Sequence, residues 1–182
     1  MFLELIVLSA AHCFRIDIVD GESGIVLTDY KVIVGKYFRG IDATESDATQ
    51  TLKIIDIHIP DKYMGSDLFY YGDIAVLTLD KAIIFRNHIA PACLNINAIH
   101  SNEKRLPNDN TLGLMAGFGQ TKEHKLSDNL KKIEIPIVNF KKCKEHSSFK
   151  SFLMPDKFCA GFTNNTGMVC RGKSIFKQAG AI

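Results

Sequence analysis

The sequence predicts an all-β fold. Hydrophobic and polar residues alternate with a period of two along several short stretches, which is typical of strands that bury one face. Turn-forming residues separate these stretches at short spacing, and no stretch of ten or more residues has the pattern of an amphipathic helix. Short strands joined by turns, with no helices between them, indicate a β-sandwich or a β-barrel.

The first half of the chain contains four expected strands. The clearest is IDIHI, Ile55 to Ile59, where strict alternation would place its three isoleucines on one face and Asp56 and His58 on the other. An uninterrupted apolar run at 74–79 (IAVLTL) indicates a buried strand. The remaining two are GIVLTDY at 24–30 and KVIVGKY at 31–37.

The second half contains two more expected strands. LGLMAGFG at 112–119 and KKIEIPIV at 131–138 are both rich in apolar and β-branched residues. Pro136 lacks a backbone N–H, so it would suit an edge strand or a bulge.

A polar stretch divides the two strand-rich halves. HSNEKRLPNDNT at 100–111 has the composition of a linker. We therefore expect an N-terminal domain at 1–99 and a C-terminal domain at 112–182. No internal repeat or low-complexity segment is present in the sequence.

Length and charge limit the classes of function. The chain has 182 residues, of which 46% are hydrophobic, so it can bury a core as one medium domain or two small ones. A formal net charge of +2 gives no reason to expect nucleic acid or an anionic membrane as a partner. The lysines around 131 and 142 are accompanied by Glu134 and Glu145, so we expect a solvated surface there. No apolar stretch approaches the roughly 20 residues of a membrane-spanning helix.

The cysteines indicate disulfides rather than a metal site. The chain contains Cys13, Cys93, Cys143, Cys159 and Cys170. None forms a C-x-x-C pair or a zinc-finger spacing with histidine, so neither a metal nor another cofactor is expected. Disulfides and a glycosylation sequon at Asn164 fit a secreted protein. The opening MFLELIVLSAA is not a convincing signal peptide, because Glu4 interrupts it and no basic residue precedes it.

Three residues occur in an order that suggests hydrolytic chemistry. His12 follows an apolar stretch and two small residues, Asp73 opens a buried run, and Ser174 lies in a Gly-x-Ser sequence. Taken singly, each has an ordinary explanation, since an Asp before a strand is most often a turn former. A serine nucleophile, however, needs a histidine base, and the base needs a carboxylate that fixes its tautomer and stabilises the imidazolium. The three together are therefore a candidate catalytic triad.

The sequence resembles the chymotrypsin/trypsin family of serine endopeptidases from about Leu5 to Ser174. The resemblance implies all-β architecture with two antiparallel β-barrels of the chymotrypsin type, the first lacking its opening strands and the second incomplete. Protein or peptide substrates and an extracellular location are implied as well. The resemblance rests on six blocks that occur in the family's order: VLSAAHC (7–13), DIAVLTL (73–79), IAPACL (89–94), MAGFGQT (115–121), FCAGF (158–162) and CRGKS (170–174).

The resemblance implies a role for each site residue. His12 matches the general base, Asp73 the orienting carboxylate and Ser174 the nucleophile. The backbone N–H groups of Gly172 and Ser174 match the oxyanion hole, which stabilises the negative charge of the transition state. Met168 matches the base of the specificity pocket.

The resemblance also implies a pattern of disulfides. Cys143 would pair with Cys159. Cys13 and Cys170 would pair beyond the two ends of this chain, and Cys93 with a propeptide or a separate light chain. We therefore expect a chain truncated at both ends, with up to three reactive thiols.

The segment around Ser174 departs from the family's pattern. Members usually read G-D-S-G-G, whereas Lys173 precedes the serine here, and Ile175 and Phe176 follow it. Lys173 reverses the charge that normally pairs with the new amino terminus after activation. Ile175 and Phe176 replace glycines at a tight turn, where bulky residues are disfavoured if φ is unusual.

Three interpretations follow from these departures. The first, which we favour for ancestry, is a serine endopeptidase represented by an incomplete, inactive chain, in which the tail after Gly172 is a splice or reading-frame artefact. The second is a non-catalytic protease homologue that uses the barrels for protein binding. The third, a β-barrel with coincidental motifs, is disfavoured by six blocks in the correct order.

Overall fold

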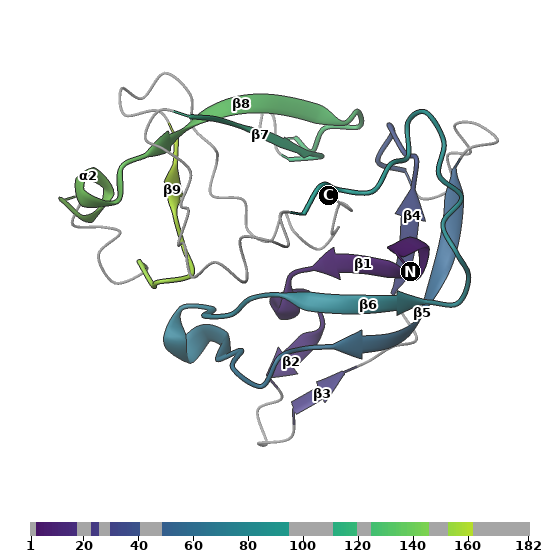
Figure 1. The fold of residues 1–182 in the computed structure, drawn as a ribbon, viewed down its shortest axis with the longest axis horizontal. Coiled ribbons are helices and arrows are strands. Elements are labelled where there is room, and N and C mark those ends of the chain that lie inside the picture. Colours follow the sequence, from purple (N-terminus) through teal and green to yellow (C-terminus); the bar gives the residue numbers. More distant parts are fainter. Residues whose placement is uncertain are drawn as a thin grey trace. The chain divides into compact units, whose positions relative to one another are not determined.

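The computed structural model describes residues 3–17, 23–25, 30–40, 49–94, 111–119, 125–145 and 153–161, with the backbone alone for 3, 15–17 and 23–25. These residues divide into two compact units, and the boundary lies between Ala92 and Cys93. Apart from short helices, the regular elements of both units are antiparallel strands (Figure 1). The predicted all-β class is therefore confirmed for the described part of the chain.

The first unit is built on a four-stranded antiparallel sheet with the strand order β1-β6-β5-β4. Its strands are β1 (Ile6–Ser9), β4 (Lys31–Val34), β5 (Gln50–His58) and β6 (Ala75–Leu79). A separate hairpin pairs β2 (Arg15–Asp17) with β3 (Ser23–Ile25). Three short 3-10 helices complete the described part of this unit: η1 (Leu3–Leu5), η2 (Ala11–Cys13) and η3 (Gly65–Leu68).

One face of this sheet forms the core of the first unit. The strand β6 alternates, with Ala75, Leu77 and Leu79 buried and the residues between them half-buried. Leu52 on β5, Leu77 and Leu79 are each only 1% exposed. Burying leucine side chains of this kind is the main favourable contribution to folding. The apolar run at 74–79 is thus a core strand, as predicted, although its second face is only partly covered.

The predicted alternation at Ile55 to Ile59 is partly wrong. Ile54 pairs with Leu79 and Asp56 with Thr78, so the register of β5 shifts and Ile55 is an extra residue. A bulge of this kind interrupts the two-residue period and turns one side chain to the opposite face. Ile55 is therefore 59% exposed, whereas Ile54 and Ile57 are buried in the core.

One expected strand is shorter than the sequence predicted, and a second is described only in part. The strand expected over 31–37 ends at Val34, because Gly35 adopts a φ of 77° that turns the chain out of the sheet. The strand expected over 24–30 is described only at its two ends. There β3 includes Gly24 and Ile25, and residues 26–29 lie outside the described residues.

The second unit contains a three-stranded antiparallel sheet with the order β7-β8-β9. Its strands are β7 (Leu112–Gly117), β8 (Lys131–Val138) and β9 (Cys159–Ala160), and a short helix α2 (Phe140–Glu145) follows β8. Pro136 lies in the middle strand rather than at an edge. The pairing of β9 with β8 ends at Ala160, which lies opposite Ile137. No residue of β9 is therefore paired with Pro136, and its missing N–H is tolerated there.

A disulfide closes the second unit. Cys143 on α2 and Cys159 on β9 are bonded, with their Cα atoms 6.4 Å apart. This is the pair that the family resemblance implied. The bond holds the short helix against the sheet, which α2 with six residues could not secure by its own helical stability.

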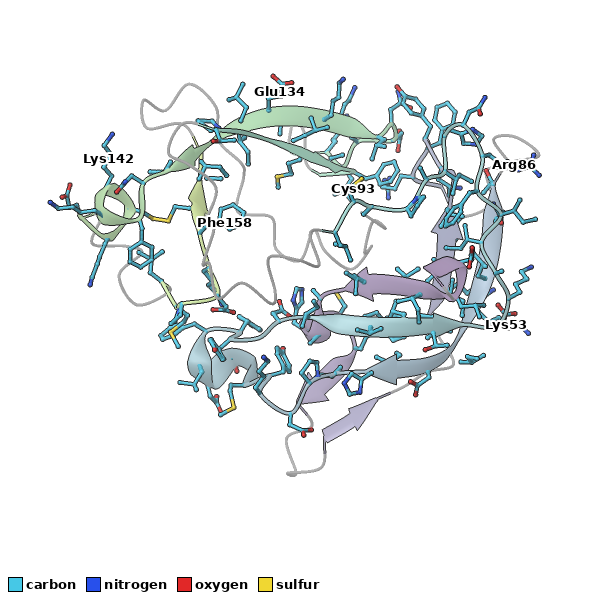
Figure 2. The ribbon with its side chains drawn as sticks, viewed as in Figure 1. Lys53, Arg86, Cys93, Glu134, Lys142 and Phe158 are labelled. Atoms are coloured by element: carbon cyan, nitrogen blue, oxygen red, sulfur yellow. A yellow bond between two sulfur atoms is a disulfide. The ribbon has the colours of Figure 1, made fainter. Side chains whose placement is uncertain are left out.

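The charged surface of the second unit agrees with the sequence. The lysines of β8 and α2 are exposed, and Figure 2 shows Glu134 and Lys142 projecting from these elements. A neighbouring ion pair joins Lys157 Nζ to both carboxylate oxygens of Asp156 at 3.2 Å. Such exposed pairs contribute little to stability, so this is the solvated surface expected from composition.

The expected domain limits are not described. All of the expected linker 100–111 except Thr111 falls outside the described residues. The limits at 99 and 112 therefore remain predictions. The two separate antiparallel sheets are consistent with part of a chymotrypsin fold.

Candidate active site

The pairing of β1 with β6 brings two distant parts of the chain together. Ser9, the last residue of β1, lies opposite Ala75, the first residue of β6. Because the strands are antiparallel, the segment that leaves β1 and the segment that enters β6 meet at the same end of the sheet. His12 lies on the first segment and Asp73 on the second.

The histidine is carried by a tightly anchored turn. Ala11 is fully buried, and Phe14 is almost so, which fixes η2 against the core on both sides of His12. The ring of Phe14 packs edge-on against Tyr30, with centroids 5.0 Å apart. The hydroxyl of Tyr30 also donates to the carbonyl of Cys13 at 2.8 Å. His12 is thus the outward-facing residue of a turn whose neighbours are held in place.

The aspartate is presented by a turn that requires glycine. Gly72 has a φ of 71°, a left-handed conformation that residues with a Cβ rarely adopt. A Cβ at this position would also lie 3.3 Å from the carbonyl oxygen of Lys62. The N–H of Ile74 bonds to the carbonyl of Gly72 at 2.7 Å, closing the turn around Asp73.

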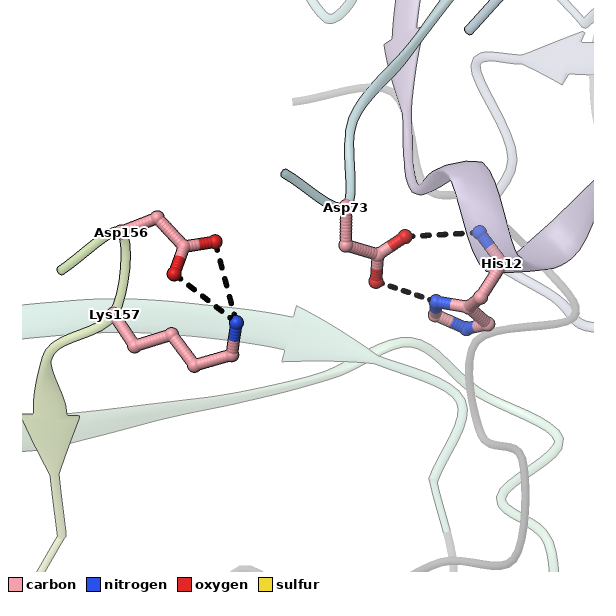
Figure 3. A network of polar contacts seen from close by, with 4 residues as sticks. All are labelled: His12, Asp73, Asp156 and Lys157. Atoms are coloured by element: carbon pink, nitrogen blue, oxygen red, sulfur yellow. Dashed lines mark hydrogen bonds and ion pairs between the residues drawn. The ribbon is translucent and has the colours of Figure 1, made fainter. Parts of the chain in front are cut away.

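Both carboxylate oxygens of Asp73 are used by His12 (Figure 3). The backbone N–H of His12 donates to Oδ1 at 2.9 Å, and the ring Nδ1 lies 2.6 Å from Oδ2. The side chains of His12 and Asp73 are 36% and 23% exposed, so the pair lies at the surface of the unit with one side covered. Since a carboxylate can only accept, Nδ1 carries the proton in the neutral ring and Nε2 is the nitrogen that can accept one.

A tyrosine that sequence reasoning missed completes the surroundings of the histidine. The rings of Tyr70 and His12 meet edge to face, with centroids 5.8 Å apart and an interplanar angle of 67°. Tyr70 and its neighbour Phe69 have φ values of 58° and 51°. No sequence pattern signals a left-handed tyrosine, because turn propensities favour Gly, Asn and Asp there.

The surroundings of the Cys13 thiol, next to His12, disfavour its thiolate form. Burial raises the pKa of the Cys13 thiol, and the negative charge of Asp73 raises it further. Reactive cysteines have lowered pKa values, because the thiolate is the attacking form. The reactivity of the Cys13 thiol therefore stays a prediction, and the raised pKa favours a slow reaction. Cys93, by contrast, is exposed and forms no disulfide with another described residue.

Comparison with known proteins identifies the family. The family model described as Trypsin matches residues 3–174. The chain belongs to the trypsin family. His12 and Asp73 both lie within the residues that match this family.

Two curated relatives support this membership. The mannan-binding lectin serine protease 1 of Rattus norvegicus is 27% identical over 176 residues, which cover 92% of this chain and 23% of the rat protein. The venom protease of Bombus pensylvanicus is 33% identical over 127 residues, which cover 66% of this chain and 49% of the bee protein. This trypsin-family chain therefore spans half or less of the length of these relatives.

The other expected site residues of this trypsin-family chain are not described. Ser174, Gly172 and Met168 lie outside the described residues, as does Cys170. Of the predicted triad, the structure brings together His12 and Asp73. Within the described ranges, no three His, Cys, Asp or Glu side chains gather as potential metal ligands. Among the same residues, no helix combines the length and the apolar character needed to cross a membrane.

Proposed function

We propose that this chain carries the base and the carboxylate of a serine endopeptidase site, in which His12 and Asp73 serve the hydrolysis of peptide bonds. The observation that supports this most is the double contact of Asp73 with the backbone N–H and the ring of His12. In a trypsin-family chain this arrangement has a clear chemical use. The substrates would be proteins or peptides.

The proposed roles follow from the geometry of the pair. Asp73 holds the proton on Nδ1, so Nε2 can take the proton of a serine hydroxyl as that oxygen attacks the peptide carbonyl. The positive charge that then forms on the ring is stabilised by the carboxylate 2.6 Å away. His12 later returns the proton to the leaving amine. In this scheme Ser174 is the nucleophile, and the N–H groups of Gly172 and Ser174 form the oxyanion hole.

We further propose that this chain, as given, is inactive. A serine hydroxyl becomes a nucleophile only when its base and the oxyanion donors are accurately placed, and an error of about 1 Å can cost a factor of roughly 100. Lys173, Ile175 and Phe176 replace the acidic residue and the glycines that shape this turn in the family. These replacements would disturb the placement of both Ser174 and the oxyanion hole.

The specificity and the setting of an active form can also be proposed. Met168 would give the specificity pocket an uncharged, polarizable base, so cleavage after Phe or Leu is favoured over cleavage after Arg or Lys. The Cys143–Cys159 disulfide fits an oxidising, extracellular environment. The exposed Cys93 would be available for a disulfide to a propeptide or a light chain.

A second candidate function is a non-catalytic homologue that binds proteins. It is the function expected when the sequence Lys173-Ser174-Ile175-Phe176 belongs to the native protein. Sequencing the transcript across the codons for Gly172 to Ile182 separates the two candidates. A continuation that reads Asp-Ser-Gly-Gly would support the enzyme, and the same Lys-Ser-Ile-Phe reading would support the binding protein.

The pairing of His12 with Asp73 can be tested without an assay of enzymatic activity. Nitrogen-15 NMR of the histidine rings, with His12 assigned through His12→Gln, reports which ring nitrogen carries the proton. We expect the Nδ1–H tautomer in the wild type and the Nε2–H tautomer in Asp73→Asn, because the amide can accept the backbone N–H but would donate to Nδ1. An unchanged tautomer in Asp73→Asn would contradict the pair.

The inactivity of the chain is tested with a serine-directed fluorophosphonate probe. We expect no adduct on Ser174 by mass spectrometry of the folded protein. Stoichiometric labelling that disappears in His12→Ala would overturn the proposed inactivity and establish that the triad assembles.

A further inference from the structure

We propose that Tyr70 is a positioning residue for His12, held in place by a strained turn, and that its ring keeps the Nδ1 edge of the imidazole directed at Asp73. This inference deepens the proposed function and rests on it for its catalytic meaning. The orientation of the ring itself is a separate, measurable property. Tyr70 precedes Asp73 by three residues and reaches His12 from a different part of the chain.

The backbone conformation at Tyr70 is unfavourable. Among the described residues, Phe69 and Tyr70 are the non-glycine residues with positive φ, at 51° and 58°. Left-handed conformations are disfavoured for residues with a Cβ, and two in succession are rarer still. Conformations of this kind persist only where the surrounding structure enforces them, and they concentrate at functional sites.

The surrounding turn does enforce this conformation. The N–H of Tyr70 bonds to the carbonyl of Gly65 at 2.7 Å, and the N–H of Tyr71 bonds to that of Leu68 at 3.0 Å. A third bond, from the N–H of Met64 to the carbonyl of Tyr71, closes the turn at 3.2 Å. Glycines with positive φ at 65 and 72 stand at its two ends.

Burial in the core does not account for the position of Tyr70. The residue is 46% exposed, whereas Tyr63, at the start of the same loop, is buried in the core at 4%. In this conformation the ring of Tyr70 makes an edge-to-face contact with His12 at 5.8 Å. Aromatic pairs with this geometry are favourable beyond the area that they bury.

This contact has a consequence for the histidine. The ring of His12 is partly exposed, and rotation about its Cβ–Cγ bond would move Nδ1 away from Asp73 Oδ2. The ring of Tyr70 packs against the imidazole and disfavours that rotation. Asp73 and Tyr70, both carried by the loop before β6, therefore restrain one ring by a hydrogen bond and by packing.

Variants of Tyr70 separate the ring contact from the backbone strain. Tyr70→Phe keeps the ring, and Tyr70→Gly removes it while accommodating the positive φ without strain. Tyr70→Ala removes the ring and keeps the strain. Tyr71→Ala is the matched control, since Tyr71 neighbours Tyr70 but does not have a positive φ.

The measurement is the state of the His12 ring by nitrogen-15 NMR, together with the exchange rate of its Nδ1 proton with water. We expect wild-type behaviour in Tyr70→Phe and Tyr71→Ala. In Tyr70→Gly we expect the proton to exchange about twofold to tenfold faster, the range that corresponds to one aromatic pair. Tyr70→Ala should behave likewise, and Tyr70→Gly keeps the test decisive if the alanine variant does not fold.

The outcomes distinguish this inference from the function on which it rests. An unchanged exchange rate and tautomer in Tyr70→Gly would overturn the positioning role, even if Asp73→Asn alters the tautomer as expected. A tautomer that is insensitive to Asp73→Asn would instead overturn the base–carboxylate pair. Faster exchange in both Tyr70→Gly and Tyr71→Ala would assign the effect to the loop as a whole and contradict the role of the Tyr70 ring.

Discussion

Ser9 and Ala75 lie opposite one another at the end of the β1–β6 pair, and this register position places His12 beside Asp73. A shift by one residue would turn the alternating side chains of β6 to the other face and lift Ala75 and Leu77 out of the core. The core therefore fixes the geometry of the site. Changes in the core, in the turn before Asp73 and in the cysteines each have a testable effect.

Gly72→Ala should destabilise the protein and disturb the site. The new Cβ would lie 3.3 Å from a backbone oxygen, and the residue would have to hold a φ of 71°. We expect a loss of more than about 1 kcal/mol in the free energy of unfolding, measured with urea. Gly117→Ala is the control, since its Cβ would meet nothing within 4 Å. Equal stability of the two variants would show that the turn tolerates a side chain.

Leu77→Ala should be among the most damaging changes in the first unit. The side chain is 1% exposed on a strand that is paired on both sides, so truncation leaves a cavity. We expect a loss of about 2–5 kcal/mol in the free energy of unfolding. Ile55→Ala, at the exposed bulge, should change it by no more than about 0.5 kcal/mol. A comparable loss in Ile55→Ala would mean that the bulge is misplaced and that the sequence alternation was correct.

Removing the disulfide should destabilise the second unit. The bond joins residues separated by 16 positions, and a loop of this length contributes about 3 kcal/mol in the chain-entropy model. Cys143→Ser with Cys159→Ser should therefore unfold at a lower urea concentration than the oxidised wild type. Cys93→Ser should have no such effect, because Cys93 is exposed. Identical unfolding of the oxidised and reduced wild type would argue against the bond.

Cys13 should react more slowly with iodoacetamide than Cys93. Its raised pKa lowers the thiolate fraction at neutral pH, and its side chain is partly buried. The measurement is the rate of alkylation of each cysteine, followed by peptide mass mapping of the native protein. Alkylation of Cys13 at the same rate as Cys93 would contradict the raised pKa.

The same shift has a consequence for alkaline stability. Below the ordinary thiol pKa of about 8.5, Cys13 is protonated in both the folded and the unfolded chain. At higher pH the unfolded chain loses this proton first, so the contribution of Cys13 to stability falls as pH rises through the folded pKa. Cys13→Ser should therefore lose less stability between pH 8 and the alkaline range than the wild type, as measured by urea unfolding at each pH.

Sequence patterns were enough to predict the class of fold and the two residues that meet at the site. Alternation and turn residues are local properties, so they predicted β8 with its bounds and the core strand β6. The order of His12, Asp73 and Ser174 suggested the catalytic pair, and the family resemblance supplied its roles and the Cys143–Cys159 pair, in advance of any geometry. Three other features could not be predicted from local patterns, because they arise from contacts within the folded chain. The bulge at Ile55 arises from pairing with β6, the left-handed Tyr70 from the hydrogen bonds of its loop, and the raised pKa of Cys13 from burial and from a carboxylate 60 residues away in the chain. Each of these depends on contacts between distant segments, and such contacts exist only once the strands have paired.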